Sequence, residues 1–222
     1  MSTISVWGRA RRPATVLLKA AMAVSGVGMA AWGTLHMAGN LLWLLGPDTM
    51  NTYGALLHGS GVLWPVRLLL VGALCVHVLG AALTTQQSRA ARPIGYRNGL
   101  RPNASTASSR SMRWTGGALL AFVVYHVLSV YGVGHPEHVP GAFHHNLSGL
   151  LSRPLDAGLL GLATGLLCLH LSHGLASAWT SVGLVSQRRA PLLRAALRGW
   201  SVLVTAGFLA PPLVRWLQAA LG

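Results

Sequence analysis

Five long runs of apolar residues dominate the chain, and shorter polar stretches separate them. A helix needs about 20 mostly apolar residues to cross a bilayer core of roughly 30 Å. Five stretches meet this requirement: residues 14–45, 65–83, 112–133, 155–179 and 197–217. Glycine, proline and serine gather in the connections, none of which is long enough for a separate domain. The pattern predicts an all-α integral membrane protein of five transmembrane helices, with a single membrane domain over residues 1–222.

The composition supports lipid as the solvent of this fold. Hydrophobic residues make up 52% of the chain and charged residues only 9%, whereas about a quarter of a soluble domain is charged. The formal charge of +14 could suggest nucleic acid, but such a protein carries its basic residues on one solvated face. Here they lie between apolar runs, so we expect no nucleic-acid partner. Cys75 and Cys168 lie inside apolar runs without a CxxCH motif, which indicates neither a disulfide framework nor covalent c-type haem.

Basic residues predict the orientation of the chain in the membrane. Fourteen of the 17 lie in the N-terminal stretch, between the second and third predicted helices, between the fourth and fifth, or in the first few residues of the helix that follows each of these stretches. The opposite side keeps Arg67, Arg153 and Arg215 and all 3 acidic residues, Asp48, Glu137 and Asp156. Because short cytoplasmic loops retain Lys and Arg, we expect a cytoplasmic N-terminus, an external C-terminus and a basic docking surface for a cytoplasmic partner.

Histidines inside the predicted helices are the candidate cofactor ligands. The first three helices carry His36, His77 and His126, and the fourth carries His170 and His173. An ionisable residue at membrane depth is costly and indicates function, and imidazoles from two facing helices can hold a haem iron. At ~1.5 Å rise per residue, His36 and His126 lie about 10 to 14 Å from the outer ends of their runs, and His77 and His170 about 9 to 14 Å from the inner ends. His173 matches the depth of His77 slightly better, so spacing leaves the ligand of the fourth helix open.

Four short motifs carry a resemblance to a known family. They are His36-Met37-Ala38-Gly39-Asn40, Arg92-Pro93-x-x-Tyr96, Met112-Arg113-x-Thr115-Gly116 with Tyr125-His126, and His170-Leu171-Ser172-His173-Gly174-Leu175. In this order and spacing they resemble the dihaem cytochrome b subunit of succinate dehydrogenases and fumarate reductases. The resemblance covers the first four predicted helices, whereas the fifth adds only hydrophobicity.

The resemblance implies a membrane-anchor subunit of succinate:quinone oxidoreductase in a bacterial-type cytoplasmic membrane. It implies two haem b groups, an outer one on His36 and His126 and an inner one on His77 and His170, with His173 as the alternative. A cytoplasmic flavoprotein with FAD and an iron–sulfur subunit would be the partners, and the dicarboxylate chemistry would lie on the flavoprotein. The chain would pass electrons between the iron–sulfur subunit and membrane quinone, for which two haems imply menaquinone.

Polar residues near the two membrane surfaces are candidates for further ligand contacts. Asn40, Asp48 and His58 lie on the outer side and could exchange protons with a quinol, whereas Lys19 and Arg113 lie on the inner side and could pair with haem propionates. Some dihaem relatives place a carboxylate where this chain has Leu169, and no acid lies in the middle of a predicted helix. We therefore expect no transmembrane carboxylate relay.

Two other functions are compatible with the pattern. The first is the dihaem cytochrome b anchor of another respiratory enzyme, although several such cytochromes take paired ligands from one helix rather than one from each. The second is a haem-free transporter, for which the sequence offers no discontinuous-helix substrate site. An outer loop also holds a cluster of histidines without the spacing of a zinc site, which we interpret as a polar loop: His135, His138, His144 and His145.

Overall fold

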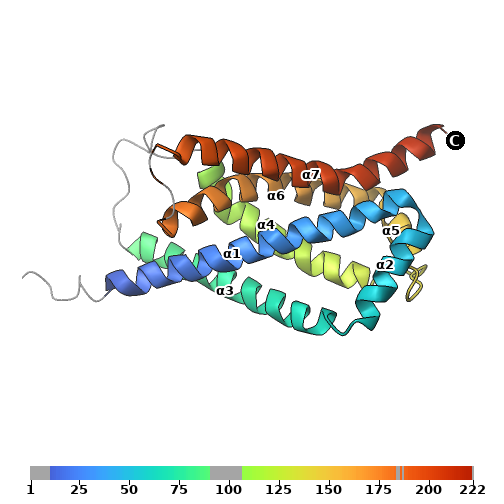
Figure 1. Cartoon of the computed structure of the whole chain (residues 1–222), viewed down its shortest axis with the longest axis horizontal. Coiled ribbons are helices and arrows are strands. Elements are labelled where there is room, and N and C mark those ends of the chain that lie inside the picture. The colour runs from blue at the N-terminus through green and yellow to red at the C-terminus, as the bar shows by residue number, and fades with distance from the viewer. Residues whose placement is uncertain (1–10, 91–106, 184–185, 187, 222) are drawn as a thin grey trace, which may run out of the picture.

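The structure is a bundle of long helices with two short helices at one end (Figure 1). The computed structural model describes residues 11–90, 107–183, 186 and 188–221. The long helices are α1 (Arg11–Leu41, continued by the 3-10 helix η2, Leu42–Leu45), α3 (Leu63–Ala90), α4 (Ala107–Val130), α6 (Pro154–Ser181) and α7 (Ala190–Leu221). All five are long and apolar enough to cross a membrane, which confirms the predicted spans within a few residues at most ends.

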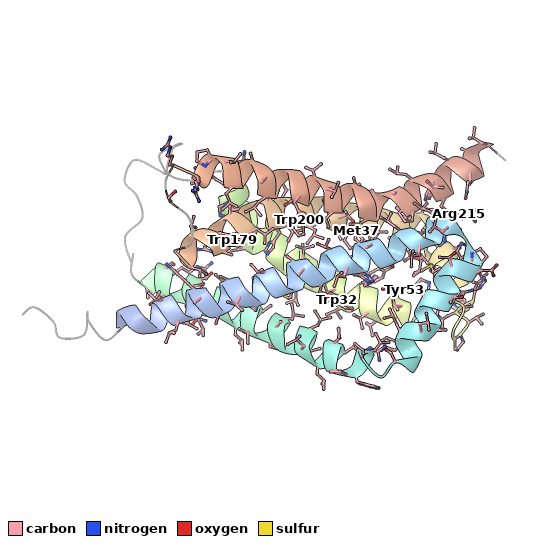
Figure 2. All side chains as sticks on the ribbon, viewed as in Figure 1. Trp32, Met37, Tyr53, Trp179, Trp200 and Arg215 are labelled. Carbon is pink, nitrogen blue, oxygen red and sulfur yellow. The ribbon has the colours of Figure 1, made fainter. Side chains whose placement is uncertain are left out.

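The outward faces of the bundle are apolar and uncovered. Only 6% to 17% of the most apolar stretch of each candidate span is buried within the protein, and side chains project outward along the whole bundle (Figure 2). In water such a surface would be far larger than the few hundred Å² of apolar patch that soluble monomers tolerate. Lipid must therefore cover these helices, and buried polar groups need partners inside the bundle.

The helices pack as two pairs around a central contact. α3 packs along α1, α4 packs along α6, α1 packs against α6, and α7 covers both α1 and α6. Small residues permit this close approach: a Cβ at Gly80 of α3 would lie 3.1 Å from the Cβ of Met22 of α1. Among the described residues, α3 and α4 share no extensive contact, so one edge of the four-helix arrangement is less tightly closed than the others.

The two ends of the bundle differ in charge and in structure. At one end, here called the basic end, α1, α4 and α7 begin and α3 and α6 finish (Figure 1). Basic residues at this end include Lys19, Arg89, Arg113, Arg188, Arg189, Arg194 and Arg198. The other end, here called the capped end, carries η2, α2 and α5 together with the three acidic residues.

Two short helices, α2 (Pro47–Gly59) and α5 (Phe143–Ser152), form the capped end. The sequence predicted that both stretches are connections between helices. The structure corrects this prediction, because each stretch is itself a helix. Gly46 has φ +100° and precedes Pro47, a turn followed by the residue best suited to a first helical position. The two short helices contact each other closely, because Gly54 of α2 lies directly against the ring of Phe143 of α5.

Hydroxyl groups within the spans are satisfied by the helices themselves. Ser25, Thr84 and Ser201 each donate to the backbone carbonyl four residues earlier, at 2.7 to 2.8 Å. Such bonds remove the cost of a free hydroxyl in hydrocarbon. In α7 the residues Pro211 and Pro212 are buried. Proline has no backbone N–H group, so neither residue donates the usual hydrogen bond to the carbonyl four residues earlier.

Candidate cofactor site

A cavity of about 820 Å³ lies within the bundle and extends from the basic end towards the capped end. Its volume falls within the range of about 300 to 1,000 Å³ that is common for ligand pockets. Helices α1, α3, α4, α6 and α7 and the side of α5 all contribute to its walls. The lining is mostly apolar, and it includes the intramembrane histidines that the sequence singled out: His36, His77, His126, His170 and His173.

The outer pair of candidate ligands is His36 of α1 and His126 of α4. Their ring centroids are 5.9 Å apart, so the structure brings together two residues that are 90 positions apart in sequence. Phe122 stacks on His126 with centroids 5.7 Å apart, and Phe208 of α7 lies 6.0 Å from His36. The sequence analysis credited the fifth span with hydrophobicity alone and missed Phe208, because nothing in a uniformly apolar run shows which side chain turns inward.

The inner pair is His77 of α3 and His170 of α6, whose ring centroids are 6.2 Å apart. His77 donates from Nδ1 to the backbone carbonyl of Met22 at 3.0 Å, since a carbonyl can only accept. Thr115 donates to the Met112 carbonyl at 3.2 Å and can therefore accept from His170 Nδ1, also at 3.2 Å. Both hydrogen bonds leave Nε2 free, which is the arrangement that orients metal-binding histidines.

Glycines leave room for these imidazoles. A Cβ at Gly26 of α1 would lie 2.9 Å from Cε1 of His77, and a Cβ at Gly116 of α4 would lie 3.3 Å from Cε1 of His170. The first distance is shorter than real Cβ contacts and the second is tight, so larger residues would displace the rings. The neighbouring helices α1 and α4 therefore cradle the inner pair without contributing a ligand to it.

The residues predicted for haem propionates lie at the basic end of the same cavity. Lys19 of α1 and Arg113 of α4 both line it. His173, Ser177 and Ser181 of α6 line it as well. These five residues form a polar margin of the cavity at the basic end. The sequence predicted Lys19 and Arg113 at this end. His173 belongs to this margin, whereas His170 faces His77.

The three candidates for a quinone site lie in different places. Asn40 lines the cavity, and its Nδ2 lies 3.4 Å from Nε2 of His36. Asp48 is exposed in the first turn of α2, and His58 is exposed near the end of that helix with Nδ1 bonded to the Gly54 carbonyl at 2.9 Å. Asp48 and His58 are not part of the cavity wall, so the structure does not bring the three together.

The structure adds one polar residue that the sequence analysis did not select, Asp156. It lies in the first turn of α6, is 7% exposed and lines the cavity near the capped end. Sequence reasoning counted it only as an acid on the outer side. The sequence does contain a sign of its importance. An acid in the first turn of a membrane helix, three residues after Arg153, is uncommon at that depth.

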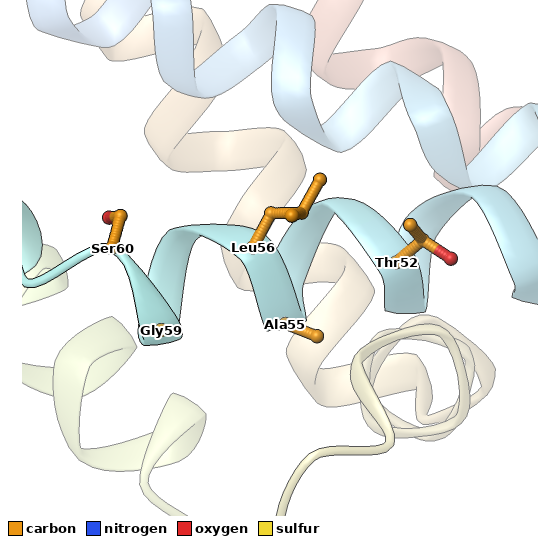
Figure 3. Close-up of a pocket in the computed structure, with 5 residues that line it drawn as sticks. All are labelled: Thr52, Ala55, Leu56, Gly59 and Ser60. Atoms are coloured by element: carbon orange, nitrogen blue, oxygen red, sulfur yellow. The ribbon is translucent and has the colours of Figure 1, made fainter.

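Other polar groups at the capped end have local roles. His144 stacks on Trp43 with centroids 5.4 Å apart, and the Trp43 indole donates to Ser148 at 2.8 Å. In the described part of the chain, no three His, Cys, Asp or Glu side chains come together as a metal site would require. A separate hollow of about 600 Å³ on the surface of α2 is lined by small or apolar residues without a titratable side chain (Figure 3): Thr52, Ala55, Leu56, Gly59 and Ser60.

Together the fold and the cavity define a polytopic helical membrane protein in which two pairs of facing histidines share one interior space. No protein-family model, curated protein or solved structure matches the chain.

Proposed function

We propose that the chain is the membrane-anchor cytochrome b subunit of a succinate:quinone oxidoreductase. Two haem b groups, on His36 with His126 and on His77 with His170, would pass electrons between a cytoplasmic iron–sulfur subunit and membrane quinone. The observation that carries the proposal is the pair of facing histidine couples, at 5.9 and 6.2 Å between ring centroids, in one cavity. Family membership and partners rest on the sequence motifs.

The separation within each couple fits a shared iron. Metal–imidazole nitrogen bonds are roughly 2 Å long, and the ring centre lies about 1 Å beyond the nitrogen, so two imidazoles on opposite sides of a metal have centroids ~6 Å apart. Within the described residues, each couple joins two helices that share no extensive contact, α1 with α4 and α3 with α6. A flat macrocycle between them would fill the space that side chains leave open.

The chain's own residues would hold such groups in defined ways. The Met22 carbonyl and Thr115 hydroxyl orient the inner imidazoles. Lys19 and Arg113 line the cavity and would form charge-assisted bonds to propionates. When bound, haem supplies a one-electron carrier, and two axial histidines leave no open iron position for oxygen chemistry. The lining of the cavity is largely apolar.

The partners follow from the charge distribution and from the motifs. The basic end offers Arg89, Arg188 and Arg194 among its exposed residues, and a cytoplasmic iron–sulfur subunit would dock there. The flavoprotein with FAD would sit on that subunit and carry out the dicarboxylate chemistry. Menaquinone is the quinone that the dihaem pattern supports.

The first prediction concerns haem content. The purified complex should contain two b haems per chain, because each histidine couple can supply both axial ligands. A pyridine haemochrome assay with protein quantification measures this, and identification of copurifying subunits separates this enzyme from other respiratory anchors.

A matched pair of variants sharpens the haem measurement. His77→Ala should lose one haem, whereas His145→Ala, at an exposed position of α5, should keep both. A complex that contains no haem in its intact form would contradict the proposal and favour a haem-free transporter.

A further inference from the structure

Asp156 is the only acidic residue in the described wall of the cavity. It is 7% exposed, and the Tyr125 hydroxyl of α4 donates a hydrogen bond to its Oδ1. Its Oδ2 accepts no hydrogen bond from any described residue, although Arg153 Nε lies 3.1 Å away and forms an ion pair with it. The negative charge of this carboxylate is therefore buried in the wall and balanced from one side.

Asp156 lies near one histidine couple and far from the other. Tyr125, whose hydroxyl binds the carboxylate, immediately precedes His126 in α4. His170 follows Asp156 by 14 residues in α6, which is about 21 Å along the helix axis. The carboxylate is thus one tyrosine side chain away from the segment that carries His126, whereas most of a membrane span separates it from the inner couple.

The other charged side chains of the described wall lie far from the outer couple. They are Lys19 and Arg113 at the basic end. Lys19 precedes His36 by 17 residues in α1, and Arg113 precedes His126 by 13 residues in α4. These separations correspond to about 20 to 26 Å of helix. Asp156 is therefore the charged residue of the wall that acts most directly on the outer couple.

Arg153 offsets this charge in part. It does not line the cavity and is 48% exposed, so solvent screens its charge more than that of the buried carboxylate. Its guanidinium is also shared with other groups, because it donates to the Gly134 carbonyl at 3.0 Å and contacts His135 Nδ1 at 2.7 Å. His135 Nδ1 lies 4.0 Å from Oδ2 of Asp156 and is the other titratable group on this side of the carboxylate.

A buried charge changes the reduction potential of a nearby haem. The iron centre loses one unit of positive charge when it is reduced, so a neighbouring anion stabilises the oxidised form and a neighbouring cation the reduced form. The apolar lining of the cavity strengthens this effect. At an effective dielectric constant of about 20 and a separation of about 10 Å, one charge shifts the reduction equilibrium about tenfold.

We propose that Asp156 sets the reduction potential of the outer haem, by holding a buried negative charge beside His36 and His126, and that Arg153 opposes it. This inference rests on the haem-binding function proposed above. Tyr125 acts as a positioning residue, because its hydroxyl holds the carboxylate against α4. Asp156 thereby makes the outer haem harder to reduce than its two imidazole ligands alone would make it.

The test is a redox titration of the purified complex with both haems in place, followed by haem absorbance at about pH 8, where an ordinary histidine is neutral. The component that is missing in His126→Ala identifies the outer haem. Asp156→Asn should raise the potential of that haem by about 60 mV, which corresponds to a tenfold change for a one-electron couple. Arg153→Gln should lower it, because the carboxylate then loses its counterion. The inner haem should keep its potential in both variants.

The opposite signs of the two shifts separate an electrostatic role from a structural one. Loosened packing at the start of α6 would move the outer potential in the same direction in both variants. Asp48→Asn is the matched control, because it removes the same charge from an exposed position at the capped end. It should leave both potentials at their wild-type values.

An unchanged outer potential in Asp156→Asn, shifts of the same sign in the two variants, or equal shifts of both haems would overturn the inference and leave the haem proposal intact. Absence of haem from the wild-type complex would instead defeat the proposed function. If Asp156→Asn does not accumulate, the variants of Arg153 decide. Arg153→Gln should lower the outer potential and Arg153→Lys, which keeps the charge, should restore it. A wild-type potential in Arg153→Gln would then overturn the inference.

Discussion

At the scale of single residues, the fourth predicted helix posed a choice between two histidines. Depth alone slightly favoured His173, whereas the motif favoured His170. In the structure the ring of His170 lies 6.2 Å from that of His77, and His173 belongs to the polar margin at the basic end. Because residues three apart on a helix point in directions that differ by about 60°, only one of them can face a given partner squarely.

The second prediction follows from this difference. His170→Ala should lose the haem that it shares with His77, because that iron would lack an axial ligand. His173→Ala should keep both haems, with a shifted reduction potential if its imidazole contacts a propionate. Haem content and low-spin electron paramagnetic resonance signals measure both effects.

A third variant, His126→Ala, is the control for loss of the outer haem in that experiment. Two retained haems in His170→Ala, together with loss of one in His173→Ala, would reverse the assignment of the inner ligand. The dihaem proposal itself would survive that result.

The residue types at the site could be predicted from the sequence, but their partners could not. Histidines at membrane depth stand out because imidazole is rare there and costly. The sequence gives no partner for Thr115, which appears there only as a motif residue, or for Asp156, which appears only as an acid on the outer side. Their roles depend on which helix faces which, and that information arises only from the packing of α4 against α6.

At the scale of elements, the spans were predictable and the capped end was not. Each span contains about 20 apolar residues, a signal that depends on composition rather than on neighbours. Helices α2 and α5 are 13 and 10 residues long, and isolated helices of about this length are at best marginally stable. They are stabilised by packing: α2 contacts η2, α5 contacts α6 and α7, and the two contact each other. Because this packing is not visible in the sequence, the glycines and prolines there suggested loops.

The third prediction tests this contact between α2 and α5. A Cβ at Gly54 would overlap the ring of Phe143, so Gly54→Ala must displace the ring or separate the helices. Overpacking of this kind costs about 1 to 3 kcal/mol, and we expect a lower thermal midpoint of the purified complex in detergent.

Gly149→Ala in α5 is the matched control, because nothing lies within 4 Å of a Cβ at that position. It should keep or slightly raise the midpoint, since alanine favours a helix by up to about 1 kcal/mol over glycine. Equal midpoints for the two variants would show that α2 and α5 do not pack as described. Both variants should keep their haem content, because neither position borders the histidine couples.

At the scale of the whole molecule, the charge separation between the two ends was visible in the sequence and is retained in the fold. α3 illustrates it within one helix, with Arg67 near its start at the capped end and Arg89 near its end at the basic end. Arg92 and Arg97, which the sequence analysis grouped with Arg89, lie outside the described residues. Positive charge at one end favours both cytoplasmic retention and the attraction of an acidic partner surface.

The fourth prediction separates docking from insertion. Reversal of Arg89, Arg92 and Arg97 to glutamate should weaken association with the soluble subunits, because the electrostatic attraction at the basic end becomes repulsion. Copurification at low and ordinary salt measures this, with the topology of each variant checked by protease accessibility. Arg67→Glu, at the other end of α3, should assemble normally. Unchanged assembly of the triple variant would show that the loop serves insertion alone.

Each histidine couple takes its two members from helices that are far apart in the chain, and this affects the order in which the couples can form during synthesis. Membrane helices emerge from the ribosome in chain order, with N-terminal segments first. The couple of His36 and His126 spans α1 and α4, whereas the couple of His77 and His170 cannot exist until α6 has been synthesised. α6 also brings Asp156 and the surface against which both α1 and α4 pack. Synthesis of α6 would therefore complete the second histidine couple, and α7 would then add the remaining wall of the cavity.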